Sequence, residues 1–282
     1  MHQIKKLTIA MSIVAMFIIA PSCSDQELQP QQDNGVSDDV KAQFKQLGFD
    51  VSDIRLVSDA NPLSSRFGAK DYILEGDIVI TEENLQQMLG SGVHHVGPVG
   101  EQYRTTNLVS NNRTIRVLGY TGGTNALDTK MRTALQQAVD NYNALNIGLT
   151  FTLSFGTNTG ANDIVVYRVS GSAGGQAGFP SGGNPYQWVQ IFSGTSSYST
   201  DVVEHVITHE IGHCLGLRHT DYFNRSLSCG SGGNEGSSGV GAIHVPGTPT
   251  GYDANSIMLS CFSSSENGEF GNYDRVALEY LY

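Results

Sequence analysis

Apolar positions along the chain change repeatedly between the spacing typical of strands and the spacing typical of helices. Residues 127–145 carry apolar side chains three or four positions apart, which predicts a helix with one face against a sheet. Runs rich in β-branched and aromatic residues predict strands at 71–81, 114–120, 149–155, 164–169 and 187–192. Shorter helices are expected at 38–47, 82–89 and 276–282, the last with Tyr280 and Leu281 packed inward.

A second long helix is expected to begin shortly after residue 200. Asp201 provides an N-cap, and Glu204 three residues later completes a capping box. Gly216 can take a left-handed backbone at low cost, so it ends this helix and turns the chain. The order of elements predicts an α+β fold. Its α/β-type N-terminal subdomain has a twisted mixed sheet and two main helices, and a loop-rich C-terminal subdomain follows.

The second helix and the turn after it carry the candidate chemistry. His209 and His213 are four positions apart, so a helix places both imidazoles on one face, where they can bind one Zn²⁺. The turn lets His219 approach as a third ligand and leaves one coordination position for water. Glu210 lies between the first two ligands and can take a proton from that water. This pattern predicts one catalytic zinc ion.

These residues resemble the signature of the metzincin clan of zinc peptidases, H-E-x-x-H-x-x-G-x-x-H followed by a Met-turn. Met258, 39 residues after His219, is the candidate for the Met-turn, and the resemblance implies that it forms an apolar floor beneath the zinc ligands. Some metzincins have a tyrosine two positions after this methionine as an extra zinc ligand. Ser260 stands there in this chain, so no such role is expected.

The chain also resembles the dual-action HEIGH metallopeptidase family of bacteria, from about Tyr72 to the C-terminus. The segments that carry this resemblance are His209–His213 and Arg218–Tyr222, with weaker support from Leu74–Ile78 and Ala277–Tyr282. It implies a metzincin-like, zinc-dependent endopeptidase that hydrolyses peptides or proteins with a zinc-bound water activated by Glu210. Two alternatives stay open: an exported, zinc-containing binding lipoprotein without protease activity, and a zinc amidase.

Two residues near the three histidines could support them from behind. Asp221, just after the third ligand, could orient His219 through its free ring N–H. His205 stands one helical turn before His209, either as a similar partner or as an ordinary helix residue. The Gly-rich segment 176–180 is a candidate for the sheet edge that pairs with the substrate backbone.

The first 22 residues predict an export signal. Lys5 and Lys6 precede an apolar run that is too short for a confident membrane span. The run leads into Cys23 through small residues, which resembles the lipobox of bacterial lipoproteins. We therefore expect lipidation of Cys23 and a cell-envelope lipoprotein at the outer membrane or cell surface, with plain secretion as the alternative. Residues 23–37 are polar and predict a tether.

Residues 38–105 form a separate N-terminal region, before a catalytic domain at 106–282. The region is a possible propeptide, because many metzincins are held inactive by a propeptide residue that replaces the zinc-bound water. Candidates for that residue are Glu75, Asp77, His94 and His95, and Arg104 is a possible activation site. Ordinary surface carboxylates and loop histidines are the alternative interpretation.

Charge and cysteine content narrow the picture. The formal net charge is −11, and it becomes −13 without the two lysines of the signal, so a nucleic-acid partner is not expected. Three cysteines follow Cys23, which allows one disulfide in an exported protein. The favoured pair is Cys229 with Cys261, and Cys214 with Cys261 is the alternative. The oligomeric state is left open.

Overall fold

The structure is a computed structural model that describes residues 35–282 except 59–60, 65–69, 91–101, 233–241 and 250. Residues 34–282 form one compact unit. None of the helices in the described part of the chain is long and apolar enough to cross a membrane. The predicted signal segment, Cys23, most of the tether and the two histidines at 94 and 95 lie outside the described residues.

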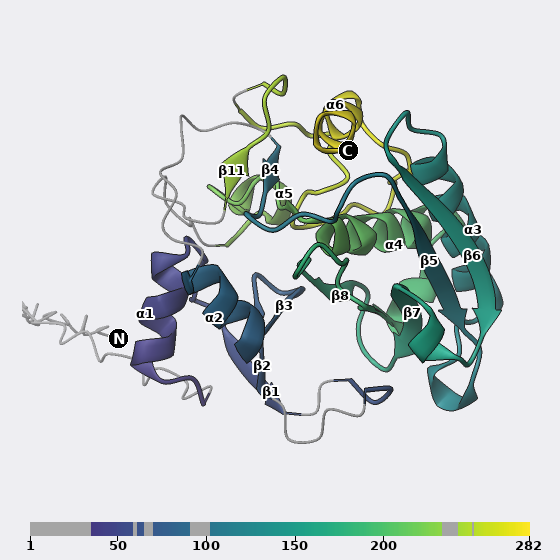
Figure 1. Cartoon of the computed structure of the whole chain (residues 1–282), viewed down its shortest axis with the longest axis horizontal. Coiled ribbons are helices and arrows are strands. Elements are labelled where there is room, and N and C mark those ends of the chain that lie inside the picture. Colours follow the sequence, from purple (N-terminus) through teal and green to yellow (C-terminus); the bar gives the residue numbers. More distant parts are fainter. Residues whose placement is uncertain (1–34, 59–60, 65–69, 91–101, 233–241, 250) are drawn as a thin grey trace, which may run out of the picture. The chain divides into compact units, whose positions relative to one another are not determined.

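The main element is an eight-stranded sheet in the order β1-β2-β3-β8-β9-β7-β5-β6 (Figure 1). Four neighbouring pairs are parallel (β3–β8, β9–β7, β7–β5 and β5–β6) and three are antiparallel, so the sheet is mixed as predicted and the α+β class is confirmed. The strands are β1 (Arg55–Ser58), β2 (Lys70–Leu74), β3 (Ile78–Thr81), β5 (Arg113–Tyr120), β6 (Leu149–Gly156), β7 (Ile164–Val169), β8 (Gly175–Gly178) and β9 (Trp188–Phe192).

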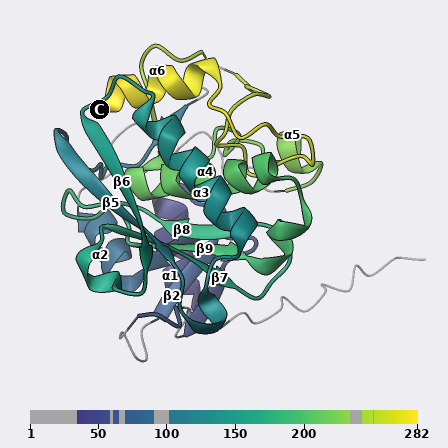
Figure 2. The same ribbon diagram turned by 90° about the vertical axis from the view of Figure 1, so that its right-hand side faces the viewer.

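The two long helices, α3 (Thr129–Asn143) and α4 (Thr200–Leu215), pack against each other and against the sheet (Figure 2). The predicted apolar face of α3 is buried in the main core, for example at Leu135 and Tyr142. Helix α4 is buried on all sides from residue 202 to residue 215. A helix that is buried all round is held by its neighbours, so its side chains have fixed positions.

The start of α4 differs from the prediction. Its N-cap is Ser199, whose hydroxyl accepts a hydrogen bond from the backbone N–H of Val202. Glu204 accepts instead from Asn141 on α3, so the predicted capping box with Asp201 is wrong. Serine and aspartate are equally good N-caps, and the sequence alone did not decide between them.

The C-terminal end of α4 agrees with the prediction. Gly216 follows it with φ of 106°, the left-handed turn that was expected. The last helix, α6 (Asn272–Leu281), starts earlier than predicted and exposes 58% of Tyr280, which was expected to face inward. Leu278 and Tyr282 are buried in its place.

Residues 71–81 form a hairpin and not the single strand that their apolar pattern predicts. The chain turns between β2 and β3, where Glu75 and Gly76 both have positive φ. Helices α1 (Asp38–Gln46) and α2 (Glu82–Gly90) pack with this hairpin around a separate hydrophobic core. The N-terminal region thus has its own core and extends the sheet through β3.

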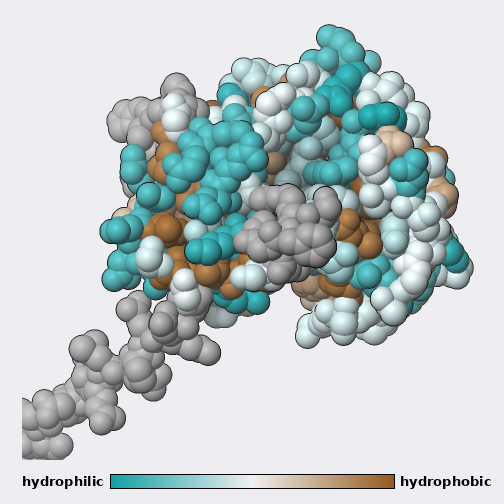
Figure 3. Space-filling model, turned by 60° about the horizontal axis from the view of Figure 1, so that its bottom comes forward, coloured by the Kyte–Doolittle hydropathy of each residue, from teal (hydrophilic) through white to brown (hydrophobic). Residues whose placement is uncertain are grey.

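A second sheet of three short strands, in the order β10-β4-β11, lies beyond α4. Its centre is β4 (Tyr103–Arg104), with β10 (Leu217–Arg218) on one side and β11 (Ile243–His244) on the other. Arg104 therefore has a paired backbone, and a protease would have to open this sheet to cut there. The remaining helical segments are α5 (Ser226–Cys229) and the 3₁₀ turns Gly123–Asn125, Thr159–Ala161 and Ser193–Ser197. Figure 3 shows one face of the molecule, which is largely hydrophilic with small, separate apolar patches.

Candidate metal centre

Three imidazole rings converge at the C-terminal half of α4. The ring centroids of His209 and His213 lie 4.6 Å apart, and the ring of His219 lies 5.3 and 4.9 Å from them. The helix places the first two, and the left-handed turn at Gly216 returns the chain for the third. The structure thus brings together the three residues that the sequence proposed as ligands.

The rings are held from behind by hydrogen bonds to backbone carbonyl groups. Nδ1 of His209 donates to the carbonyl oxygen of Ile257 at 2.8 Å, and Nδ1 of His213 donates to that of Leu217 at 2.8 Å. Because a carbonyl oxygen only accepts, both rings carry their proton on Nδ1 when neutral. Each Nε2 then presents a lone pair to the centre of the cluster, as a metal ligand must.

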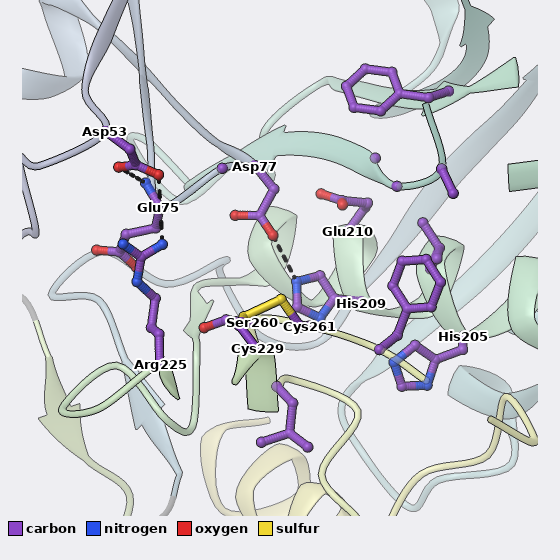
Figure 4. A pocket seen from close by; sticks show the side chains of 18 residues that line it. Asp53, Glu75, Asp77, His205, His209, Glu210, Arg225, Cys229, Ser260 and Cys261 are labelled. Atoms are coloured by element: carbon purple, nitrogen blue, oxygen red, sulfur yellow. Dashed lines mark hydrogen bonds and ion pairs between the residues drawn. A yellow bond between two sulfur atoms is a disulfide. The ribbon is translucent and has the colours of Figure 1, made fainter. Parts of the chain in front are cut away.

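A fourth donor comes from the N-terminal region. Oδ2 of Asp77, at the tip of the β2–β3 hairpin, lies 3.1 Å from Nε2 of His219 and 3.4 Å from Nε2 of His209 (Figure 4). One ligand atom from each of the three histidines and from Asp77 lies within 4.8 Å of all the others. From the sequence, Asp77 was only one of four candidates for the residue that blocks the zinc site, because the hairpin that positions its carboxylate was not predicted.

This donor set fits a zinc ion. Nε2 of His213 is fully buried and has no hydrogen-bond partner among the described residues, which is a costly state for a polar atom unless it binds something. Three imidazole nitrogens and one carboxylate oxygen match the ligand types and the number of ligands that zinc takes. The residues present therefore fit the metal that the sequence pattern predicts.

Met258, the candidate for the Met-turn, packs against α4 between its two histidine ligands. Its side chain is fully buried, and a Cβ atom built on Gly212 would lie 2.6 Å from its sulfur. The carbonyl oxygen of Met258 accepts a hydrogen bond of 2.9 Å from the N–H of Thr220, next to His219. The methionine segment thus supports α4 and also fixes the chain beside the third ligand.

Comparison with known proteins agrees with this geometry. The profile of the family described as "Dual-action HEIGH metallo-peptidase" matches residues 72–282. The chain belongs to this family. It is therefore a metallopeptidase, a hydrolase that acts on peptides or proteins. The match includes the hairpin that carries Glu75 and Asp77.

No curated protein is significantly similar to this metallopeptidase in sequence. Two solved structures of myroilysin are similar to it in part, each with a TM-score of 0.39. One is 15% identical and covers 63% of this chain and 82% of that chain. The other is 19% identical and covers 68% and 91%, respectively.

Glu210, the general-base candidate of the metallopeptidase, lines the same pocket as His209. The carboxylate of Glu210 is buried against Gly175 of β8, and its Oε2 has no hydrogen-bond partner among the described residues. Burial, with the nearby negative charge of Asp77, raises the pKa of Glu210 well above its usual value. A carboxyl group with a raised pKa is suited to accept and then release a proton.

The hairpin tip and the third histidine shift each other's pKa through their charges. Burial alone would raise the pKa of Asp77, but the charge of His219 and hydrogen bonds to His209 and His219 lower it below its usual value. Burial would lower the pKa of His219, but Asp77 and Glu75 raise it well above its usual value. His219 therefore stabilises the ionised carboxylate of Asp77.

Glu75, and not Asp221, orients the third histidine. Oε2 of Glu75 accepts a hydrogen bond of 3.1 Å from Nδ1 of His219, so the role predicted for Asp221 is wrong. Glu75 has φ of 56°, a left-handed backbone that is unfavourable for glutamate. Strained residues of this kind persist where the surroundings require them, and here the buried carboxylate is held by its partners.

Asp221 joins two loops that flank the centre. Its Oδ1 accepts from the backbone N–H and the hydroxyl of Ser260, at 3.0 and 2.8 Å, and its Oδ2 accepts from the hydroxyl of Ser228. Beside these contacts, the structure pairs Cys229 with Cys261, the disulfide that the sequence favoured. The segment after Met258 is thus fixed to the loop after His219 by a covalent bond and by the two hydrogen bonds between Ser260 and Asp221.

Cys214 and His205 are buried parts of α4. Cys214 is a free, fully buried thiol, and burial raises its pKa well above the usual value, so it packs as a small apolar side chain. Burial, with the charge of His209, lowers the pKa of His205 to about 3, which keeps this ring neutral. Nδ1 of His205 lies 3.8 Å from Oε2 of Glu266, outside the cluster of the three ligand histidines and Asp77.

A pocket of about 390 Å³ opens beside the cluster, between α4, β8, the hairpin tip and the segment after Met258 (Figure 4). The edge of β8, predicted to pair with substrate, is covered by β3 in parallel register, with Ile78 opposite Ala177 and Val79 opposite Gly178. The N-terminal region therefore contacts the metal centre through Asp77 and pairs with β8 through β3.

Proposed function

We propose that this metallopeptidase is a zinc-dependent endopeptidase with Glu210 as its general base. The convergence of three Nε2 atoms on one point, with the carboxylate of Glu210 beside them, carries the proposal. Family membership supports peptide hydrolysis over the amidase and binding-protein alternatives. A sheet edge beside the centre supports an endopeptidase, because backbone pairing can grip the middle of a chain regardless of its sequence.

The residues have separate roles. His209, His213 and His219 would hold the zinc ion, which when bound supplies a Lewis acid that polarises the scissile carbonyl group and makes water more acidic. Glu210 takes a proton from the attacking water and passes it to the leaving amine nitrogen. Met258 packs against Gly212 and so fixes the position of α4, which carries the ligands His209 and His213.

The N-terminal region, residues 38–105, keeps the enzyme latent in this proposal. The carboxylate of Asp77 takes the position beside His209 and His219 where water would otherwise bind, and β3 covers the edge of β8. Activation then requires displacement of the hairpin.

Export and lipidation are the remaining parts of the proposal. The basic start, the short apolar run and the small residues before Cys23 support a lipoprotein of the cell envelope. The disulfide between Cys229 and Cys261 fits an oxidising compartment. Mass spectrometry of protein purified from membranes tests both points through the mass of the N-terminal peptide and the oxidation state of the two cysteines.

The decisive test uses Glu210→Ala and the matched exposed change Glu279→Ala. We expect Glu210→Ala to abolish casein hydrolysis by the activated enzyme while elemental analysis still finds one zinc per chain. Glu279→Ala should keep both properties, because Glu279 is exposed on α6. Casein hydrolysis by pure Glu210→Ala protein at the unmutated rate would reject the proposed mechanism, and a metal other than zinc would reject the cofactor.

A further inference from the structure

The N-terminal region places carboxylates on two arginines beside the metal centre. Nη2 of Arg218 donates to Oε1 of Glu75 at 2.8 Å, and both side chains are fully buried. The ring of Phe49, also from the N-terminal region, stacks on this guanidinium group at 4.2 Å, and Tyr222 lies on it at 5.7 Å. Apart from Tyr222, these contacts of Arg218 come from the segment that must leave on activation.

Arg225 is held in the same way. Its Nη2 donates to Oδ2 of Asp50 at 2.7 Å, and its Nη1 lies 3.6 Å from Oδ2 of Asp53. Arg225 lines the pocket that also contains His209 and Glu210, and Figure 4 shows it on the side where Glu75 approaches. Three acidic residues of the N-terminal region thus meet two arginines of the catalytic part.

We infer that Arg218 and Arg225 form a binding subsite for acidic side chains of the substrate, so that the enzyme selects peptides with Asp or Glu near the scissile bond. The inference rests on the proposed function, because it requires the N-terminal region to be displaced. Displacement of the N-terminal region takes Glu75, Asp50 and Asp53 away from the two guanidinium groups. A substrate carboxylate can then bind where one of these carboxylates was.

The hairpin also indicates where the acidic residue lies. Glu75 precedes Asp77 by two positions, and Asp77 lies at the metal centre. The carboxylate of Glu75 binds Arg218 through Oε1 and His219 through Oε2, so a substrate carboxylate that reaches Arg218 lies next to the metal centre and belongs to a residue close to the scissile bond. Guanidinium groups bind carboxylates through paired, charge-assisted hydrogen bonds, which gives the subsite its selectivity over amides.

The test compares two peptides that differ only by Glu or Gln at this position. The full chain is loaded with zinc and processed until mass spectrometry shows that the N-terminal region has been released. A mixed peptide library first identifies the position, and we expect Asp and Glu to be enriched there among cleaved peptides. The Glu peptide should then be cleaved with about 10- to 100-fold higher kcat/KM than the Gln peptide.

Variants assign the preference to the arginines. Arg225→Ala should remove most of the Glu-over-Gln preference, measured as the ratio of the two kcat/KM values. Arg116→Ala, which changes an exposed arginine that pairs with Asp163, is the matched control and should keep the preference. Arg218 is deeply buried, so Arg218→Lys is the milder change, and it should weaken the preference because lysine cannot bind a carboxylate through two parallel hydrogen bonds.

A binding measurement separates this inference from the proposed function. Glu210→Gln protein, processed by the unmutated enzyme or by an added protease, should bind the Glu peptide more tightly than the Gln peptide even though it cannot cleave either. Equal binding and equal cleavage of the two peptides would overturn the inference, as would an N-terminal region that stays bound after the chain is cut. Failure of the zinc-loaded enzyme to cleave any peptide would reject the endopeptidase, while the binding result would still decide on the arginines.

Discussion

Asp274 on α6 accepts a hydrogen bond of 2.8 Å from the backbone N–H of Ile257, the residue before the Met-turn methionine. The carbonyl group of Ile257 in turn accepts from Nδ1 of His209 at 2.8 Å. The same carboxylate accepts from the hydroxyl of Ser256 and the amide of Gln102, at 2.8 and 2.7 Å. A buried carboxylate far along the chain therefore fixes the orientation of a metal ligand through one peptide unit.

Replacing Asp274 with asparagine should weaken metal binding without touching a ligand. Each oxygen of Asp274 accepts from two donors, so the NH2 group of asparagine would face either the N–H groups of Ile257 and Gly271 or the donors of Ser256 and Gln102. We expect a loss of about 1–3 kcal/mol in the free energy of unfolding and about 10- to 100-fold weaker zinc binding. Chelator competition and thermal unfolding measure the two effects.

Glu279→Gln on the same helix is the control, because this side chain is exposed and should change neither value. Unaltered zinc affinity in a folded Asp274→Asn protein would show that the peptide unit of Ile257 keeps its place without the carboxylate.

Glu204 predicts an unusual dependence of stability on pH. Burial, with the negative charges of Glu269 and Asp201, raises the pKa of Glu204 to about 7. A carboxyl group whose pKa is higher in the folded state than in the unfolded state binds its proton more tightly in the folded state. Its stabilising contribution to the free energy of unfolding is therefore present at low pH and is lost as the pH rises toward 7. Glu204→Gln keeps the oxygen that accepts from Asn141 and cannot ionise.

We therefore expect the Glu204→Gln variant to melt higher than the unmutated protein at pH 8, by several degrees, and at nearly the same temperature at pH 4. Differential scanning calorimetry of both proteins in the same buffers gives the comparison across pH 4–8. A variant that is less stable at pH 8 would mean that the ionised carboxylate is stabilising in the fold.

Gly212, the glycine of His-Glu-Ile-Gly-His, should not tolerate even a methyl group. A Cβ atom there would lie 2.6 Å from the sulfur of Met258 and 3.3 Å from its terminal carbon. Alanine normally favours a helix over glycine by about 1 kcal/mol, but overpacking of a buried contact costs about 1–3 kcal/mol. We expect Gly212→Ala to lower the melting temperature and peptidase activity together.

Gly90→Ala is the matched control, because this glycine also lies in a helix and has no atoms within 4 Å of the Cβ position. Full activity of Gly212→Ala would show that Met258 can move aside, and that contact with Met258 is not the reason for a glycine at this position.

The sequence predicted the elements whose signal is local. Helix α3, the turn at Gly216 and the three ligands follow from spacing within a few residues of each other, and the structure places them as expected. The turn at Glu75 was missed because apolar runs on both sides read as one strand, although Gly76 inside the run was a turn signal. The partner of His219 was missed for a different reason, since its carboxylate stands 144 positions earlier in the chain.

Latency should depend on one carboxylate. Asp77→Ala removes the oxygen that lies 3.1 Å from Nε2 of His219, so the hairpin would lose its carboxylate at the metal centre and keep the pairing of β3 and the contacts of Glu75 with Arg218 and His219. Because a metal-bound carboxylate contributes much of the affinity in such a site, we expect freshly purified, zinc-loaded Asp77→Ala chain to hydrolyse a fluorogenic peptide with a shorter lag. Its initial rate should exceed that of the unmutated chain by about tenfold or more.

Asp39→Ala, which changes an exposed carboxylate on α1, should behave like the unmutated chain. Zinc content measured beside the rates distinguishes loss of the blocking group from loss of the metal, since the three imidazoles remain. An unchanged lag in Asp77→Ala protein with full zinc occupancy would show that latency depends on other contacts, either the pairing of β3 with β8 or the contacts of Glu75. A Glu75→Gln chain measured in parallel would distinguish between these two.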